Sequence, residues 1–76
     1  MSVTLYTTPS CGYCRLAKDY FRQNGISFTE YNVAADPHRA DEMLRRSGQM
    51  GVPVIDVNGR IIVGFNQSEI ERALNR

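Results

Sequence analysis

Two cysteines near the start of the chain constrain its fold more than any other feature. They lie in residues 8–14, which read TPSCGYC, and the protein has no others. The two residues between Cys11 and Cys14 place the sulfur atoms one helical turn apart, close enough to form a disulfide or to share a metal ion. A disulfide that closes so short a loop constrains little chain entropy. We therefore expect this stretch to be a chemical site rather than a structural cross-link.

Length and charge exclude several classes of function. With 76 residues, the chain is predicted to form one small domain, residues 1–76, around a single core. Its 9 basic and 8 acidic side chains nearly cancel and are scattered, which argues against nucleic acid or an anionic membrane as a partner. No apolar run approaches the roughly 20 residues of a membrane span, and Met1 leads into the chain without a signal-peptide pattern. We expect a cytoplasmic monomer, in a reducing compartment where paired cysteines are more often catalytic or metal-binding than structural.

The segment around the cysteines is predicted to be a strand followed by a helix. Residues 3–7 are β-branched and aromatic without a breaker, and Pro9 ends this strand. The helix that follows stops at Asn24–Gly25 and leaves Cys11 at its N-terminus. Apolar residues recur with helical spacing along one face of this helix, at Tyr13, Leu16, Ala17, Tyr20 and Phe21.

A second strand and helix are predicted next. The strand runs through Tyr31, flanked by apolar residues on both sides. Asp36–Pro37 then supplies a cap and a proline at the first helical position. The helix is expected to end at Ser47–Gly48 and to point three side chains inward: Ala40, Met43 and Leu44.

The rest of the chain is predicted to be a hairpin and a last helix. Residues 52–57 and 60–63 are strand-like, and Asn58–Gly59 between them is a strong hairpin signal. Asn66 and Glu69 resemble a capping box at the start of a helix. Strands joined through a helix are parallel, whereas the hairpin is antiparallel. The order βαβαββα therefore predicts an α/β fold with a four-stranded mixed sheet flanked by three helices.

This fold gives the cysteines a mechanism. Cys11 has the free backbone N–H groups of the helix start beside it, and Arg15 and Lys18 follow on the next turns. We expect these groups to lower the pKa of the Cys11 thiol and make it the nucleophile, with Cys14 as the resolving thiol. Two alternatives are weaker: buried cysteines acting as small hydrophobes, and a zinc site for which His38 is the only other soft ligand.

The chain resembles a glutaredoxin over essentially its whole length. The residues that carry the resemblance are the CGYC motif after a VTLYT strand, Gly51-Val52-Pro53 before a strand, and Gly64-Phe65 before the last helix. The resemblance implies a thioredoxin-like fold, thiol–disulfide oxidoreductase activity, glutathione as cosubstrate and disulfide-containing proteins as substrates, with no obligatory bound cofactor. It also implies a cis peptide before Pro53, with Tyr13, Val52 and Pro53 framing a groove for peptide or glutathione. Further substrate contacts are implied for Gln49, Gly64, Asn66 and Gln67.

Three departures from the common glutaredoxin pattern matter. Gly12 stands where proline is usual, and residues 8–10 lack the lysine that often precedes the first cysteine. Residues 64–67, GFNQ, stand where many members have a glycine, a small residue and two aspartates. The Gly-Phe pair resembles the NrdH-type redoxins, whose reductant is thioredoxin reductase. Asn66 and the start of the last helix still offer polar groups to a carboxylate, although helix capping explains Asn66 equally well.

A second hypothesis is an iron–sulfur carrier. In it, Cys11 of two subunits and two glutathione thiols hold a [2Fe–2S] cluster. A brown colour in anaerobically purified protein, lost in Cys11→Ser, would support this hypothesis. The charged helix end at Arg45 and Arg46 is predicted to be solvated, and His38 to face solvent. Four aromatic residues are predicted to lie in the core, Tyr6, Tyr20, Phe21 and Phe28, and Phe65 to lie either there or in the groove.

Overall fold

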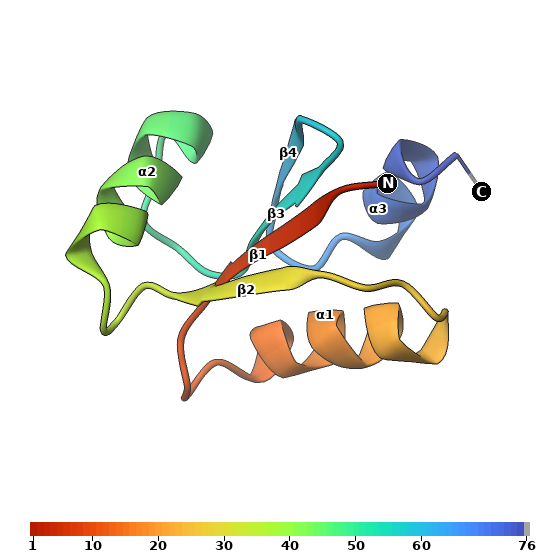
Figure 1. Cartoon of the computed structure of the whole chain (residues 1–76), viewed down its shortest axis with the longest axis horizontal. Helices are drawn as coiled ribbons and strands as arrows, with labels where there is room; N and C mark the ends of the chain where they lie inside the picture. The colour runs from red at the N-terminus through yellow and green to blue at the C-terminus, as the bar shows by residue number, and fades with distance from the viewer. Residues whose placement is uncertain (76) are drawn as a thin grey trace.

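The computed structural model describes residues 1–75 of the chain (Figure 1). Its elements follow the predicted order βαβαββα. They are β1 (Val3–Thr7), α1 (Gly12–Gln23), β2 (Thr29–Asn32), α2 (Pro37–Ser47), β3 (Val54–Val57), β4 (Arg60–Val63) and α3 (Gln67–Ala73).

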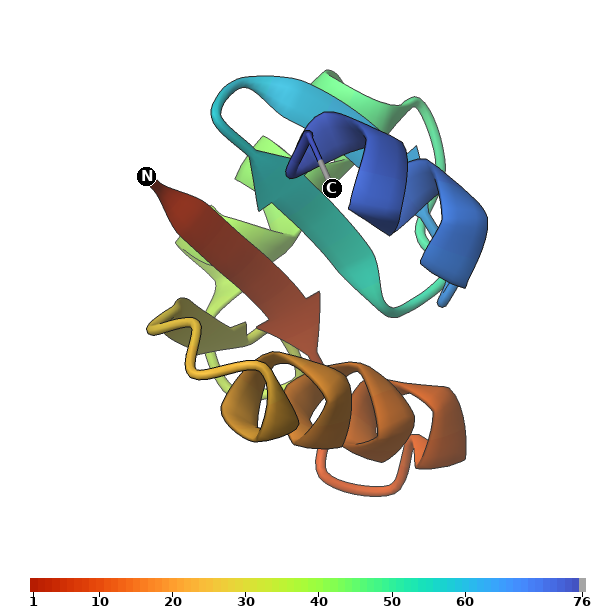
Figure 2. The same cartoon turned by 90° about the vertical axis from the view of Figure 1, so that its right-hand side faces the viewer.

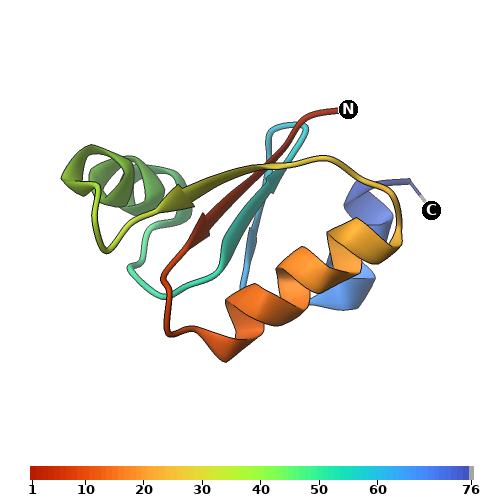
Figure 3. The same ribbon diagram turned by 60° about the horizontal axis from the view of Figure 1, so that its bottom comes forward.

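The four strands form one mixed sheet in the order β2-β1-β3-β4. β1 pairs in parallel with β2 and antiparallel with β3, and β3 pairs antiparallel with β4. α3 lies in front of the sheet and α2 behind it in Figure 2, while α1 lies on the same side as α3 in Figure 3. This is the thioredoxin-like arrangement, and it brings the end of β1 directly to the N-terminus of α1.

The face of the sheet under α1 and α3 holds the larger apolar core. Alternate strand residues point to this face because side chains alternate along a strand. Phe21 of α1 and Ile70 of α3 are both fully buried against them. The buried cluster consists of Val3, Leu5, Ala17, Phe21, Ile26, Ile55, Val57, Ile62, Ile70 and Leu74. Tyr20 and Phe28 pack against it but are only half-buried, so they lie at its rim rather than in its centre.

The face under α2 holds a smaller apolar cluster. Tyr6, Met43 and Val54 are fully buried there. Leu44, which was predicted to point inward, is 42% exposed, because α2 is the lone helix on this face and buries only a narrow stripe. Leu16 of α1 is likewise 49% exposed, so the apolar stripe of that helix is wider than the surface it covers.

The predicted caps and the hairpin turn are present. The Asp36 carboxylate accepts a hydrogen bond from the N–H of Arg39 over 3.2 Å, and Pro37 follows it at the start of α2. Asn58 adopts φ 53°, the left-handed conformation that a tight hairpin turn requires. Its N–H donates to the carbonyl of Ser2 and its side chain accepts the N–H of Ser2, both over 2.8 Å. The hairpin tip thereby fixes the start of β1.

No helix within residues 1–75 is both long enough and apolar enough to cross a bilayer.

Candidate active site

Cys11 and Cys14 form a disulfide at the N-terminus of α1. Cys11 is the N-cap residue, with extended backbone dihedrals, and the N–H of Cys14 donates to its sulfur over 3.0 Å. The same N–H would stabilise a thiolate on Cys11 after reduction, together with the positive end of the helix dipole. Cys11 is half-buried, whereas Cys14 is 1% exposed. The two sulfurs therefore differ in access to a substrate.

The basic side chains near the motif contribute less than the sequence suggested. Arg15 is exposed, and the ammonium group of Lys18 pairs with the Glu30 carboxylate over 3.0 Å. The buried Thr7 hydroxyl donates to the same carboxylate oxygen over 2.6 Å. This hydrogen bond from Thr7, with the charge of Lys18, holds the pKa of Glu30 below its usual value. The charge of Lys18 is therefore paired with Glu30, whereas the N–H of Cys14 at the helix start contacts the Cys11 sulfur directly.

The loop before β3 lies against the first sulfur. The Val52 carbonyl oxygen is 3.8 Å from the Cys11 sulfur, and the Val52–Pro53 peptide is cis. The N–H of Gly64 donates to the Pro53 carbonyl over 2.8 Å, which ties the end of β4 to this loop. Residues from three separate parts of the sequence therefore meet beside the disulfide.

A groove of about 530 Å³ opens next to the Val52–Pro53 peptide. It brings together six of the residues predicted to contact substrate: Tyr13, Val52, Pro53, Gly64, Asn66 and Gln67. Val63, Phe65 and Ser68 complete its lining. Val63 and Ser68 were not among the residues predicted to contact substrate. Val63 is the exposed last residue of β4, and the alternation of that strand is the signal that could have identified it.

Two groove residues also have structural roles. The side-chain oxygen of Asn66 accepts the N–H of Glu69 over 3.2 Å and the Ser68 hydroxyl over 3.1 Å, so it caps α3. Phe65 is half-buried, packs edge-on against Tyr20 and lines the groove, so both predicted locations apply to it.

Gln49 does not line this groove. Its amide is folded back onto its own loop, where it contacts the backbone of Gly51 and the hydroxyl of Ser47. The structure therefore does not bring Gln49 together with the other residues predicted to contact substrate.

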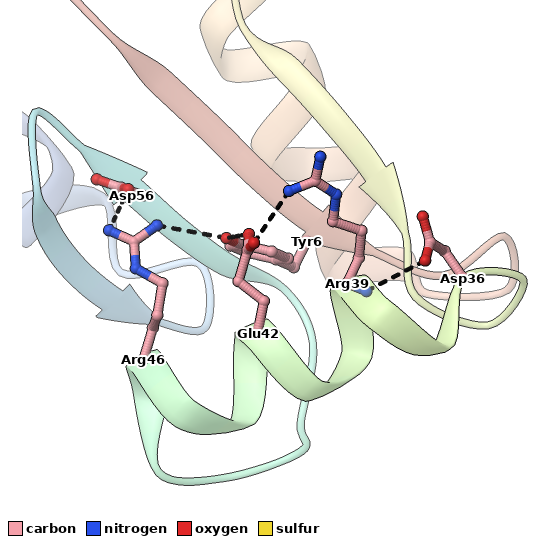
Figure 4. Close-up of polar contacts among 6 residues, drawn as sticks. All are labelled: Tyr6, Asp36, Arg39, Glu42, Arg46 and Asp56. Atoms are coloured by element: carbon pink, nitrogen blue, oxygen red, sulfur yellow. Dashed lines mark hydrogen bonds and ion pairs between the residues drawn. The ribbon is translucent and has the colours of Figure 1, made fainter.

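A polar cluster that was not predicted lies on the α2 face (Figure 4). The buried Tyr6 hydroxyl donates to the Glu42 carboxylate and accepts from the Arg46 guanidinium over 3.3 Å. Arg46 also pairs with Asp56 over 2.6 Å, and Arg39 pairs with Glu42 over 3.0 Å. The prediction of a merely solvated charge at Arg46 is wrong, because the helix turns this side chain toward Asp56 on β3.

The contacts in this cluster shift the pKa values of its members. Burial and the hydrogen bond to Glu42 raise the pKa of Tyr6. The same hydrogen bond, with the nearby Arg39 charge, lowers the pKa of Glu42. Arg39 also places its guanidinium 3.8 Å from the centre of the Tyr31 ring, a cation–π contact that closes the cluster on the β2 side. No polar atom of a buried side chain within residues 1–75 lacks a hydrogen-bond partner.

The described residues contain no candidate metal site. Within residues 1–75, no three or more His, Cys, Asp or Glu side chains are grouped so as to hold a metal ion. His38 is exposed on α2, as predicted.

Known proteins resemble this chain over most of its length. The family model of the glutaredoxins matches residues 3–62. A "glutaredoxin-like 8.6 kDa protein in rubredoxin operon" of Clostridium pasteurianum is 42% identical over 74 residues, 97% of this chain and 99% of that protein. Glutaredoxin 3 of Escherichia coli strain K12 is 35% identical over 63 residues, 83% of this chain and 76% of that protein. The solved structure of the glutaredoxin-like protein NrdH-redoxin from Escherichia coli is similar with a TM-score of 0.82 and 32% identity, covering 95% of this chain and 93% of that one. The chain belongs to the glutaredoxin family and is a thiol–disulfide oxidoreductase.

Proposed function

We propose that Cys11 is the attacking thiol of the exchange reaction and Cys14 the resolving thiol. The observation that carries this assignment is the difference in access between the two sulfurs. Cys11 is half-buried beside Val52, whereas Cys14, in the first turn of α1, is 1% exposed. A substrate disulfide can therefore reach Cys11 first. The N–H of Cys14 and the helix start favour the thiolate of Cys11, which is the reactive form.

The reaction proceeds in two exchanges. In the reduced protein, the Cys11 thiolate attacks one sulfur of a substrate disulfide, and the other substrate sulfur leaves and takes up a proton. The product is a mixed disulfide between Cys11 and the substrate. Cys14 then loses its proton and attacks the Cys11 sulfur, which releases the second substrate thiol and forms the Cys11–Cys14 disulfide. Two electrons pass through sulfur alone, so the exchange needs no organic prosthetic group.

We propose that the groove binds the peptide or glutathione part of the disulfide. It lies beside the Val52 carbonyl, where an extended peptide can pair with backbone, and Tyr13 offers a 67% exposed aromatic face. Disulfide-containing proteins and glutathione are the partners that fit this arrangement. When glutathione occupies the mixed disulfide, a second glutathione can resolve it in place of Cys14. A monomer in a reducing cytoplasm is the setting we propose for this cycle.

A further question is which molecule reduces the Cys11–Cys14 disulfide in the cell. Residues 8–10 contain no lysine that could pair with a carboxylate, and the Asn66 oxygen already occupies the N–H of Glu69 at the start of α3. Both features weaken the groove as a carboxylate site. The similarity to NrdH-redoxin, described as glutaredoxin-like with a thioredoxin-like activity profile, supports the same conclusion. We propose that glutathione binds weakly and that thioredoxin reductase is the more efficient reductant.

The cysteine roles are tested with single serine variants. Cys11→Ser should lose all exchange activity. Cys14→Ser should keep activity on a glutathionylated substrate but lose activity on a protein disulfide, because only the second needs an internal resolving thiol. In the reduced unsubstituted protein, iodoacetamide should label Cys11 faster than Cys14 at neutral pH, measured by peptide mass spectrometry. Faster labelling of Cys14 would overturn the assignment.

The reductant is tested by assaying one substrate with glutathione plus glutathione reductase, and with thioredoxin reductase. We expect faster turnover with thioredoxin reductase. Thr8→Lys should lower KM for a glutathionylated substrate, since a charge-assisted hydrogen bond contributes about 1.5 to 3 kcal/mol when desolvated and less at an exposed rim. Thr29→Lys on β2 is the matched control. If the unsubstituted protein works at low glutathione and Thr8→Lys changes nothing, glutathione is the natural reductant.

A further inference from the structure

The loop from the end of α2 to Val52 is organised by one side chain, that of Gln49. The Gln49 carbonyl oxygen accepts the N–H of Gly51 over 2.5 Å, and its amide nitrogen donates to the Gly51 carbonyl over 3.1 Å. The same nitrogen lies 3.3 Å from the Ser47 hydroxyl, which in turn donates to the Met43 carbonyl in α2 over 2.6 Å. The Gln49 amide thus joins the helix end to the residue that precedes Val52.

The Gln49 amide can contact the backbone of Gly51 because Gly51 has no side chain. A Cβ atom placed on Gly51 would lie 2.7 Å from the Gln49 side-chain oxygen, a distance that real Cβ atoms do not tolerate. The absence of a side chain at Gly51 therefore lets the Gln49 amide close on the backbone. Directly after Gly51, the Val52 carbonyl oxygen lies 3.8 Å from the Cys11 sulfur. The contacts of Gln49 consequently fix the chain one residue before the group that faces the reactive sulfur.

We propose that Gln49 is a positioning residue that holds the Val52 carbonyl against Cys11 and thereby sets the reduction potential of the Cys11–Cys14 pair. Its amide is not a substrate contact, because both ends of the amide are engaged within the loop. This inference rests on the exchange reaction proposed for Cys11 and Cys14. Turnover of a substrate measures that reaction independently of the reduction potential.

The direction of the effect follows from charge. A carbonyl oxygen carries partial negative charge, so it opposes a thiolate on Cys11 in the reduced protein and acts on no charge in the disulfide form. When the loop is released, the carbonyl moves away and the reduced form gains stability relative to the disulfide. A pair whose reduced form is stabilised is more oxidising. Loss of the Gln49 contacts should therefore make the reduction potential less negative.

The main variant is Gln49→Ala. The matched control is Gln23→Ala, at the end of α1 far from the cysteines. Gly51 is exposed, so water can satisfy the backbone groups that Gln49 releases. The potential is measured by equilibration in glutathione redox buffers and mass spectrometry of the trapped thiols. We expect Gln49→Ala to shift the dithiol–disulfide equilibrium constant about two- to fivefold, or about 9 to 21 mV less negative at 29.6 mV per tenfold. Gln23→Ala should show the potential of the unsubstituted protein.

A second variant tests the same loop without removing Gln49. Gly51→Ala should displace the Gln49 amide and shift the potential in the same direction. The double variant Gln49→Ala with Gly51→Ala should shift it no further than Gln49→Ala alone, because the amide that the new Cβ displaces is already gone. Additive shifts in the double variant would overturn the proposal.

Steady-state kinetics distinguish this inference from the alternative. If Gln49 contacts the substrate, Gln49→Ala should raise KM for a glutathionylated substrate while the reduction potential stays unchanged, and the inference fails. A potential that is unchanged or more negative overturns it whatever happens to KM. If neither the unsubstituted protein nor Gln23→Ala turned over a disulfide substrate, that result would count against the proposed function itself.

Discussion

The two faces of the sheet are held by different means. Under α1 and α3, ten buried apolar side chains form one continuous cluster. Under α2, three buried side chains are supplemented by the polar cluster of Tyr6, Glu42, Arg46 and Asp56, with Arg39 at its edge. Two helices cover enough surface to seal an apolar core, whereas one short helix does not. On the α2 face, directional hydrogen bonds and ion pairs supply what burial cannot, and they also fix where the helix lies.

This difference also matters for the active site, because a helix from each face of the sheet leads into it. Cys14 lies on the helix anchored in the larger core, while the loop to Val52 continues from the end of α2. The cysteine pair is therefore fixed by apolar packing, whereas the loop that carries Val52 follows a helix held in part by polar contacts. Substitutions on the two faces should separate these contributions.

The largest loss of stability is expected from the larger core. Phe21→Ala should reduce the free energy of unfolding by about 3 to 5 kcal/mol, because it leaves a cavity at a fully buried position. That is a large share of the total free energy of unfolding, which for folded proteins is about 0.05 to 0.15 kcal/mol per residue. Urea denaturation measures the change. Leu16→Ala on the same helix, at a 49% exposed position, should cost far less, and equal losses would contradict the distinction between the two positions.

A substitution in the smaller core should have a more local effect. Met43→Ala should cost in the lower part of the range of about 2 to 5 kcal/mol for such changes, because fewer apolar side chains surround it. Amide hydrogen exchange should accelerate in α2 more than in α1. The exposed neighbour Leu44→Ala provides the control. Equal acceleration in both helices would mean that the faces do not open independently.

Removing one hydroxyl tests the polar cluster itself. Tyr6→Phe should cost about 1 to 3 kcal/mol, because Glu42 and Arg46 each lose a hydrogen-bond partner in a partly buried place. Tyr31→Phe is the control, since it keeps the ring against which Arg39 lies. Both variants are compared by thermal denaturation. A Tyr6→Phe protein as stable as Tyr31→Phe would show that apolar packing alone holds α2.

The smallest expected effect is on the stability of the protein at low pH. The pKa of Glu42 is lowered in the folded protein, mainly by the Tyr6 hydrogen bond, from an ordinary value of 4.5. Its stabilising contribution is therefore present above pH 4.5 and is lost as the pH falls through the lowered value. Glu42→Gln should flatten the acid limb of the stability curve by less than about 1 kcal/mol. Asp41→Asn, one residue earlier in α2, controls for the loss of one acidic side chain, and an acid limb unchanged in Glu42→Gln would contradict the assignment.

The sequence predicted the elements whose signals are local. Asn58–Gly59 specified the hairpin, Asp36 specified the start of α2, and the strand end at Pro9 followed by a helical pattern placed the cysteine pair at a helix start. Each depends on a few adjacent residues with a particular backbone requirement. The order of the strands followed from connection rules, since a helix between two strands makes them parallel.

What the sequence missed depends on contacts between distant residues. Arg46 was predicted to be solvated because nothing near it in the chain indicates Asp56, which lies ten residues later on β3. Leu44 has the helical spacing of a core residue, and only the narrowness of the α2 contact explains why it is exposed. The amide of Gln49 could have pointed to the groove or to its own loop, and the position of Gly51 decided between them.

The clasp between Ser2 and Asn58 has a practical consequence for building sensors from this protein. β1 begins and α3 ends at the end of the molecule away from the turn that carries the cysteines (Figures 1 and 3). Since the hairpin tip anchors Ser2 by two hydrogen bonds, a fluorescent reporter fused ahead of Met1 would start from a fixed point. Such a fusion would leave the mouth of the groove unobstructed for a large protein disulfide.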